Sequence, residues 1–284
     1  MTFSEIRKKV GTTTIQTKSV LSGTRTGAFK VYAAGSGYDF DQLREYQEGD
    51  DFRRIDWKSS ARSNTLLMRE YKDERSRTTH IVLDSSASMA YGSQKLLLSD
   101  VARELAMALC SITTRTDDDI TLHGITHAAQ ALHGGWGSGE KHLMQLLHTL
   151  NAVQYEGKRP LKNVLEQFHQ RCRRRSLVFL ISDFIDADYD TVLRTLALRH
   201  ELAVIRIRDV NEDAVVAATA AITCQDSELA SVAYEADGVD GGAVMRRWRN
   251  EQALQFKKLQ IPWFDCYNDG HHLDQLLEFI RRYF

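Results

Sequence analysis

The chain has 284 residues, with 37 Lys and Arg against 38 Asp and Glu, so its formal net charge is -1. This balance argues against a protein that holds nucleic acid by bulk positive charge. With 43% apolar residues the chain can fill a real core, which excludes wholesale disorder. No stretch approaches the 18 uninterrupted apolar residues of a membrane span, and residues 1–10 lack the apolar core of an export signal. We therefore expect a cytoplasmic protein with no membrane span.

The first part of the chain, residues 1–77, is rich in Thr, Gly, Asp and Arg, and its first helical stripe comes only at 40–46. We expect a small N-terminal module of irregular and β structure here. A segment this polar could hardly stabilise itself, so we expect it to pack on the rest of the chain.

From residue 78 onward, short apolar runs alternate with helical periods, a pattern typical of a parallel sheet with crossover helices. The run 176–182 is apolar on both faces, which predicts a strand in the middle of the sheet. Residues 78–284 are thus predicted to form a doubly wound α/β domain, mostly parallel, with helices on both faces and a weaker pattern from about residue 212. We expect strands at 80–84, 120–125, 128–132, 176–182, 201–208 and 261–267. We expect helices capped by Ser93, around 143–150, from Pro160, and at 190–199, 243–259 and 271–283.

The cysteines lie far apart along the chain, with no pair at the short spacing of a zinc knuckle or redox motif. We expect buried thiols at Cys110, Cys172, Cys224 and Cys266.

Acidic and hydroxyl side chains follow two of the predicted strands. Asp84 ends the first strand and is followed by Ser86 and Ser88, and Asp183 ends the strand at 176–182. Ligands bind where parallel strands end, so these side chains should face one crevice. Carboxylate and hydroxyl oxygens suit Mg²⁺. The plainer interpretation is that Asp84 and the serines only cap a helix.

The DxSxS turn and the second Asp resemble the metal-ion-dependent adhesion site of von Willebrand factor A domains. The resemblance implies that Asp84, Ser86, Ser88 and Asp183 hold an ion, and that an acidic residue of a partner fills its open position. The family also uses a Thr before the third helix. This chain has Gly157, Lys158, Arg159 and Pro160 in that loop, and a cation there would compete with the ion.

A second signature precedes the turn. It runs from Gly35 to Phe40, continues through REYQEGDDFRRIDWKSSAR at 44–62, and ends in a Glu-containing strand at 69–75. It closely resembles the bacterial family known as domain of unknown function 58, whose members are usually found beside MoxR-type AAA+ ATPases. The resemblance spans about residues 22–208. The signature residues are Arg44, Tyr46, Asp50, Arg53, Arg54, Asp56, Trp57 and Arg62.

Two interpretations of this signature stay open. Its alternating Arg and Asp residues could form an ion-pair network that fixes the module to the sheet, with Ile55 and Trp57 as buried apolar anchors. In that arrangement the strand at 69–75 would run beside the strand at His80. Alternatively, the signature is a docking surface near the metal crevice.

These observations predict a non-enzymic interaction adaptor with a metal-ion-dependent adhesion site that is either functional or degenerate. The resemblance implies that it works with a MoxR-type AAA+ ATPase in the maturation or assembly of a client protein. The alternative is a metal-dependent hydrolase or phosphotransferase with Asp84 as its nucleophile. Phosphotransferases of that type need an acid or base two positions later, where this chain has Ser86.

Overall fold

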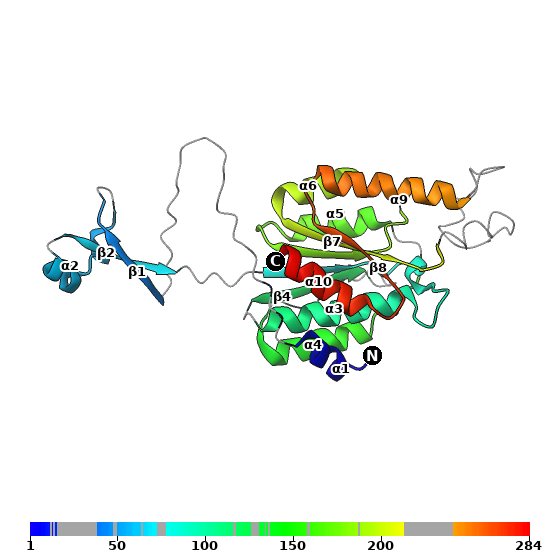
Figure 1. Cartoon of the computed structure of the whole chain (residues 1–284), viewed down its shortest axis with the longest axis horizontal. Coiled ribbons are helices and arrows are strands. Elements are labelled where there is room, and N and C mark those ends of the chain that lie inside the picture. Colours follow the sequence, from blue (N-terminus) through cyan, green and yellow to red (C-terminus); the bar gives the residue numbers. More distant parts are fainter. Residues whose placement is uncertain are drawn as a thin grey trace. The chain divides into compact units, whose positions relative to one another are not determined.

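The computed structural model describes residues 1–11, 13, 15, 39–47, 50–63, 65–72, 78–115, 118–125, 131–133, 135, 137–157, 160–186, 188–212 and 241–284. The chain divides into two compact units. Unit 1 contains Met1–Lys18 and Arg77–Phe284, and unit 2 contains Ser19–Ser76 (Figure 1). The N-terminal residues therefore belong to the α/β unit, whereas the sequence analysis placed all of residues 1–77 in one module.

Unit 1 is built on a six-stranded sheet in the order β5-β4-β3-β6-β7-β8. The pairs are parallel except for β4 with β5. Counted along the chain within this sheet, the order is 3-2-1-4-5-6, that of doubly wound α/β proteins. The predicted fold class is therefore confirmed. The strands are β3 (Thr78–Leu83), β4 (Asp119–Ile125), β5 (Ala131–His133), β6 (Leu177–Ser182), β7 (Glu201–Arg208) and β8 (Trp263–Tyr267).

Helices cover both faces of this sheet (Figure 1). On one face are α1 (Phe3–Val10), α3 (Leu98–Thr114), α4 (Gly139–Asn151) and α10 (His272–Tyr283). On the other are α5 (Leu161–Arg171), α6 (Asp190–Arg199) and α9 (Gly241–Lys258). No helix in the described ranges combines the length and the apolar character needed to cross a bilayer.

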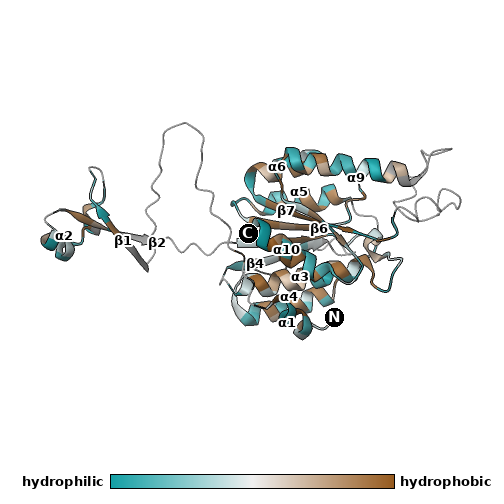
Figure 2. Ribbon diagram, in the orientation of Figure 1, coloured by the Kyte–Doolittle hydropathy of each residue, from teal (hydrophilic) through white to brown (hydrophobic). Residues whose placement is uncertain are grey.

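A hydrophobic core lies on each face of the sheet, and the spacing of apolar residues along each helix and strand explains which side chains enter which core. In α5, Leu161, Val164, Leu165 and Phe168 recur at helical spacing and are all buried. In β3, Ile81 and Leu83 face the α3 layer, whereas Val82 faces the α5 layer. Every residue of β6 is buried, as predicted for a central strand, and β6 and β7 are largely apolar (Figure 2). Three of the four cysteines, Cys110, Cys172 and Cys266, are confirmed as buried thiols, and Cys224 lies outside the described residues.

The predicted start of the first long helix was wrong. The helix begins at Leu98 with Leu97 at the N-cap position, so Ser93 is not its cap. Its backbone N–H instead donates to the Asp209 carboxylate at 2.7 Å, and its hydroxyl contacts the same carboxylate. The link fixes the segment between the 3-10 turn η2 (Ala87–Ala90) and α3 to the end of β7.

Unit 2 contains a two-stranded antiparallel sheet of β1 (Asp39–Glu45) and β2 (Leu67–Lys72), with the 3-10 turn η1 (Phe52–Arg54) and α2 (Trp57–Ser63) between them. The helical stripe predicted at 40–46 is a strand. Its register skips Asp41, since Phe40 pairs with Tyr71 and Gln42 with Glu70. The expectation that the strand at 69–75 runs beside β3 is also wrong, because the partner of β2 is β1.

Candidate functional site

Asp84 is held rigidly at the carboxyl end of β3. Its backbone N–H donates to the carbonyl of Ile181 at 2.9 Å, which extends the pairing of β3 with β6 by one residue. The hydroxyl of Ser182 donates to Asp84 Oδ2 at 2.6 Å, and the Ser86 N–H donates to Oδ1 at 2.9 Å. The side chain is 3% exposed. Both carboxylate oxygens therefore have fixed directions, as a ligand or a turn-forming residue requires.

The two serines of the DxSxS turn lie next to this carboxylate. The hydroxyl oxygens of Ser86 and Ser88 are 2.9 Å apart and share a hydrogen bond. Between them, the N–H of Ala87 donates to the carbonyl of Gly157 at 3.1 Å. The loop at Gly157 thus lies against the turn, as the resemblance implied. Lys158 and Arg159 lie outside the described residues, so the competing cation expected there stays a prediction.

Asp183 brings a second carboxylate to the same place from the end of β6. It is 3% exposed, and its Oδ1 accepts from the N–H of Ile185 at 3.1 Å. Its Oδ2 is buried and has no hydrogen-bond partner at bonding geometry within the described residues. Burial and then the charge of Asp84 raise the pKa of Asp183 to about 7, and the Ser88 hydroxyl partly opposes this shift. The predicted convergence of Asp84, Ser86, Ser88 and Asp183 is present in the structure.

The electrostatics of this group fit a cation. Burial raises the pKa of Asp84 as well, and the charge of Asp186 adds to this effect. Burial and mutual repulsion destabilise the ionised forms of both carboxylates. A nearby positive charge would therefore stabilise these ionised forms strongly. The donors are carboxylate and hydroxyl oxygens, the types that Mg²⁺ and similar hard ions take. Asp183 Oδ2 is an oriented oxygen that still lacks a partner among the described residues.

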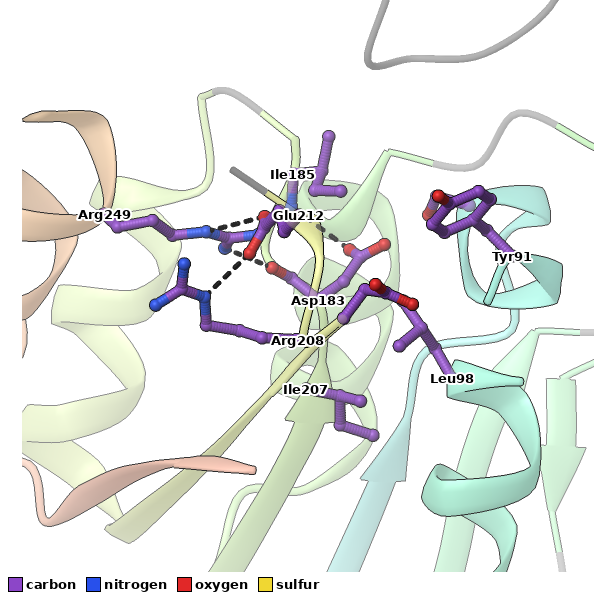
Figure 3. A pocket seen from close by; sticks show the side chains of 10 residues that line it. Tyr91, Leu98, Asp183, Ile185, Ile207, Arg208, Glu212 and Arg249 are labelled. Carbon is purple, nitrogen blue, oxygen red and sulfur yellow. Dashed lines mark hydrogen bonds and ion pairs between the residues drawn. The ribbon is translucent and has the colours of Figure 1, made fainter. Parts of the chain in front are cut away.

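A pocket opens beside these groups, with about 360 Å³ of empty space. Ser88 and Asp183 line it together with apolar side chains, among them Tyr91, Leu98 and Ile207 (Figure 3). Its charged wall is formed by Arg208 and Glu212 at the end of β7 and by Arg249 of α9. The cluster of Asp84, Ser86, Ser88 and Asp183 thus borders a cavity with both apolar and charged walls.

Arg249 is the residue of this wall that reaches closest to the site. It is 3% exposed and pairs with the carboxylate of Glu212, which also accepts from Arg208 Nε at 2.7 Å. Its Nη1 donates to the backbone carbonyl of Asp183 at 2.6 Å (Figure 3). The cation therefore contacts the main chain of Asp183 and is neutralised by Glu212.

A second residue of α9 fixes the same strand end. Phe184 has a φ of 55°, a left-handed conformation that is costly for an aromatic residue. The amide of Gln252 donates to the Phe184 carbonyl at 2.7 Å, and the Ser182 hydroxyl accepts from the Phe184 N–H at 3.0 Å. Glu212, Arg249 and Gln252 were not predicted as site residues. The only sequence signal for Arg249 and Gln252 is that two polar residues lie three positions apart in the helix predicted at 243–259.

Unit 2 holds the signature residues, and some of them form local pairs. The guanidinium of Arg44 binds Asp50 through two hydrogen bonds, at 2.7 and 2.8 Å. These bonds lower the pKa of Asp50 to about 2. Asp56 accepts from the N–H groups of Lys58 and Ser59 at the start of α2, and its other oxygen pairs with Arg69 at 3.0 Å. Tyr46 is half-buried, and its N–H donates to the carbonyl of Leu66.

The other signature residues differ in their exposure. The side chains of Arg53 and Arg62 are exposed, and that of Arg54 lies outside the described residues. Ile55 is buried, as predicted for an apolar anchor, and forms a bridge to Met68. Trp57 is 65% exposed, so the prediction that it is a buried anchor was wrong. Trp57 is the first residue of α2, and Phe52 is exposed to a similar extent.

Comparisons with known proteins show what this chain is similar to. The uncharacterised protein Rv1480 of Mycobacterium tuberculosis is 28% identical over 196 residues, which are 68% of this chain and 62% of that protein. The chain thus spans less than two thirds of the length of this relative.

Among solved structures, the conserved hypothetical protein BatB of Bacteroides thetaiotaomicron has a TM-score of 0.44 and 12% identity, over 72% of this chain and 98% of BatB. A von Willebrand factor type A protein of Catenulispora acidiphila has a TM-score of 0.37 and 14% identity, over 53% and 38%.

The strand order and the DxSxS turn described above are those of a von Willebrand factor A-like fold. The family model described as "Protein of unknown function DUF58" matches residues 42–234, about two thirds of the chain. The chain belongs to the DUF58 family.

Proposed function

We propose that this protein is a non-enzymic interaction adaptor that binds its partner through a divalent cation at the carboxyl ends of β3 and β6. The observation that carries the proposal is the buried Asp183 Oδ2, which lacks a partner among the described residues and lies beside the carboxylate of Asp84. An ion would offset the repulsion of the two carboxylates and bind the free oxygen at once.

Asp84, Ser86, Ser88 and Asp183 would hold this ion, with Mg²⁺ as the first candidate. When bound, the ion supplies a positive site that accepts an oxygen from outside the chain. The apolar wall of the pocket, with Leu98 and Ile207, would exclude water around that contact. An acidic side chain of a partner has the matching charge, as the resemblance to metal-ion-dependent adhesion sites implies.

The partner that the family resemblance suggests is a MoxR-type AAA+ ATPase, and the joint role would be the maturation or assembly of a client protein in the cytoplasm. Support for this step comes from the resemblance of residues 35–75 to the family signature and not from the crevice itself.

The state of Asp84 supports a binding role over the enzymic alternative. Both oxygens of its carboxylate accept hydrogen bonds, and the side chain is 3% exposed, which hinders in-line attack on a phosphate. Position 86 is a serine, so the acid or base of a phosphotransferase is missing there.

The test measures binding of the purified chain to a purified MoxR-type ATPase, with Mg²⁺ and with a chelator. We expect Mg²⁺-dependent binding that Asp84→Asn abolishes and that Arg247→Ala, an exposed change on α9, leaves intact. Binding that ignores both the chelator and Asp84→Asn would overturn the cation-centred contact. Release of phosphate from a generic ester by wild type but not by Asp84→Asn would overturn the non-enzymic role.

A further inference from the structure

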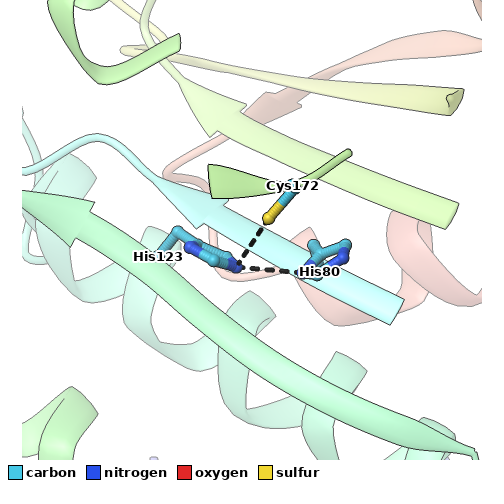
Figure 4. A group of neighbouring side chains, drawn as sticks. All are labelled: His80, His123 and Cys172. Atoms are coloured by element: carbon cyan, nitrogen blue, oxygen red, sulfur yellow. Dashed lines mark hydrogen bonds between the residues drawn. The ribbon is translucent and has the colours of Figure 1, made fainter. Parts of the chain in front are cut away.

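A second group of metal-ligating side chains lies away from the Asp84 crevice, in the core of unit 1. It contains His80 of β3, His123 of β4 and Cys172, which directly follows α5 (Figure 4). His80 Nδ1 and His123 Nε2 are 2.9 Å apart, and Cys172 Sγ is 3.9 Å from the same His123 nitrogen. All three donor atoms lie within 4.8 Å of one another. Three elements distant in sequence thus direct two imidazoles and one thiol to one point.

The strand register explains why the two imidazoles meet. His80 pairs with Thr121 and Val82 pairs with His123, so both histidines face the α5 side of the sheet. Phe168 of α5 covers them, with ring centroids 5.3 Å from His80 and 5.0 Å from His123. The exposed fractions are 0% for His80, 6% for His123 and 3% for Cys172. The donors are therefore enclosed by an apolar shell.

The two distances that involve His123 are close to those of a tetrahedral zinc site, and the third donor pair lies within 4.8 Å. Bond lengths of about 2.0–2.1 Å to nitrogen and 2.3 Å to sulfur place two nitrogens about 3.3 Å apart, and nitrogen and sulfur about 3.6 Å apart. The observed 2.9 and 3.9 Å differ from these values by less than half an ångström each. Rotations of the side chains alone can supply such shifts.

We propose that His80, His123 and Cys172 bind a Zn²⁺ ion, with a fourth position left for a water molecule. Nitrogen and sulfur donors favour Zn²⁺ over Mg²⁺, whereas the all-oxygen Asp84 group favours the reverse. The two sites would thus select different metals. Binding takes one proton from the Cys172 thiol, which is released to solvent, while both imidazoles bind in their neutral form. Burial raises the pKa of Cys172 to about 11, so the thiol keeps its proton until an ion displaces it.

Cobalt provides the probe, because Co²⁺ occupies zinc sites and absorbs visible light. The full chain is unfolded, freed of metal and refolded with Co²⁺, since the donors are too buried for simple addition to be decisive. We expect one equivalent of bound Co²⁺, with intense ligand-field bands of four-coordinate cobalt and a near-ultraviolet sulfur-to-cobalt charge-transfer band. Addition of Zn²⁺ should bleach both.

Variants assign the donors. Cys172→Ser should lose the charge-transfer band, and His123→Gln should weaken Co²⁺ binding by more than about 100-fold, because even loss of an outer-sphere partner costs 10–100-fold. Cys110→Ser removes a thiol that is equally buried in α3 and should keep both spectra. Asp84→Asn should keep them too, so this result is independent of the proposed function.

The outcome that overturns the zinc site is read first on wild type, which avoids dependence on variants that fail to fold. If refolded wild type shows no sulfur-to-cobalt band, the cluster is a hydrogen-bonded histidine pair with an inert thiol. The same conclusion follows if Cys172→Ser, folded by circular dichroism, keeps the band of wild type.

Discussion

Arg249 donates to the backbone oxygen of Asp183 and forms its ion pair with Glu212, and its charge only partly opposes the rise in the pKa of the Asp183 carboxyl. Glu212 is 7% exposed, and its carboxylate accepts hydrogen bonds from both Arg249 and Arg208. The arrangement keeps the strand end in place while Asp183 Oδ2 stays without a hydrogen-bond partner among the described residues.

The first prediction concerns this link. Arg249→Met keeps the apolar stem of the side chain but leaves Glu212 with one cation fewer in a buried place. Loss of one partner of a buried ion pair costs about 3–5 kcal/mol, and we expect a loss of this size in the free energy of unfolding by urea. Arg247→Met on the same helix should change little, because its pair with Glu251 is exposed. Equal effects of the two substitutions would contradict the role assigned to Arg249.

The second prediction concerns the ion. Asp183→Asn keeps the shape of the side chain and removes one of two neighbouring buried charges. Without metal, this variant should melt at the same temperature as wild type or higher. Mg²⁺ at about 100 times its Kd should stabilise wild type by about 2.7 kcal/mol and should not stabilise Asp183→Asn.

Asp188→Asn serves as the control for this experiment. Asp188 is exposed, five positions further along, and its φ of 66° is one that Asn adopts readily. Its Mg²⁺ shift should match that of wild type. Equal shifts in all three proteins would show that the cation stabilises the fold elsewhere.

A third prediction follows from the exposure of Trp57. Because the ring is 65% exposed, Trp57→Ala should change the stability of unit 2 by no more than about 0.5 kcal/mol. Ile55→Ala removes a buried side chain and should cost about 2 kcal/mol or more. Hydrogen exchange of the β1 and β2 amides measures both.

The same pair of variants separates the two interpretations of the family signature. If the exposed ring contacts the ATPase, Trp57→Ala should weaken capture of the partner at unchanged stability. If Trp57→Ala instead speeds exchange throughout β1 and β2, the signature is structural after all.

The fourth prediction concerns pH and the core of unit 1. Burial first, and then the charge of Arg199, lower the pKa of His200 from 6.5 to about 4. Between these values the unfolded chain binds a proton that the folded chain does not, so stability falls as the pH falls from 6.5 towards 4. The loss should be on the order of 1–3 kcal/mol at the acid end.

His200→Gln removes this titration and should flatten the dependence of the unfolding free energy on pH over that interval. His148→Gln, an exposed change on α4, should leave the slope of wild type unaltered. An unchanged slope in His200→Gln would assign the acid sensitivity to other groups.

Much of unit 1 could be predicted from local patterns. Asp84 and Asp183 were paired correctly because both follow apolar runs, and the carboxyl ends of neighbouring parallel strands meet at one edge of a sheet. The residues that hold this edge in place were out of reach. Arg249 lies 66 residues from Asp183, and only the folded chain brings α9 against the end of β6.

Unit 2 shows where periodicity misleads. Because the pairing of β1 with β2 skips Asp41, Phe40 and Leu43 are only two positions apart in the ladder, although three residues apart in the sequence, which is a helical spacing. The hydrophobic period of a bulged strand therefore imitates a helix. The sequence predicts Trp57 as a buried anchor because large aromatic residues are usually buried, and Trp57, at 65% exposed, departs from this statistical preference.

The packing of α1 changes how the chain is connected. Ile6 and Val10 are buried in the same core as α3 and α10, although residues 19–76 separate this helix from the rest of unit 1. Unit 2 is therefore an insertion with both ends tethered, and not an extension that trimming from the N-terminus could remove. A single proteolytic cut within it would leave two polypeptides that remain associated through α1 and separate only when unit 1 unfolds.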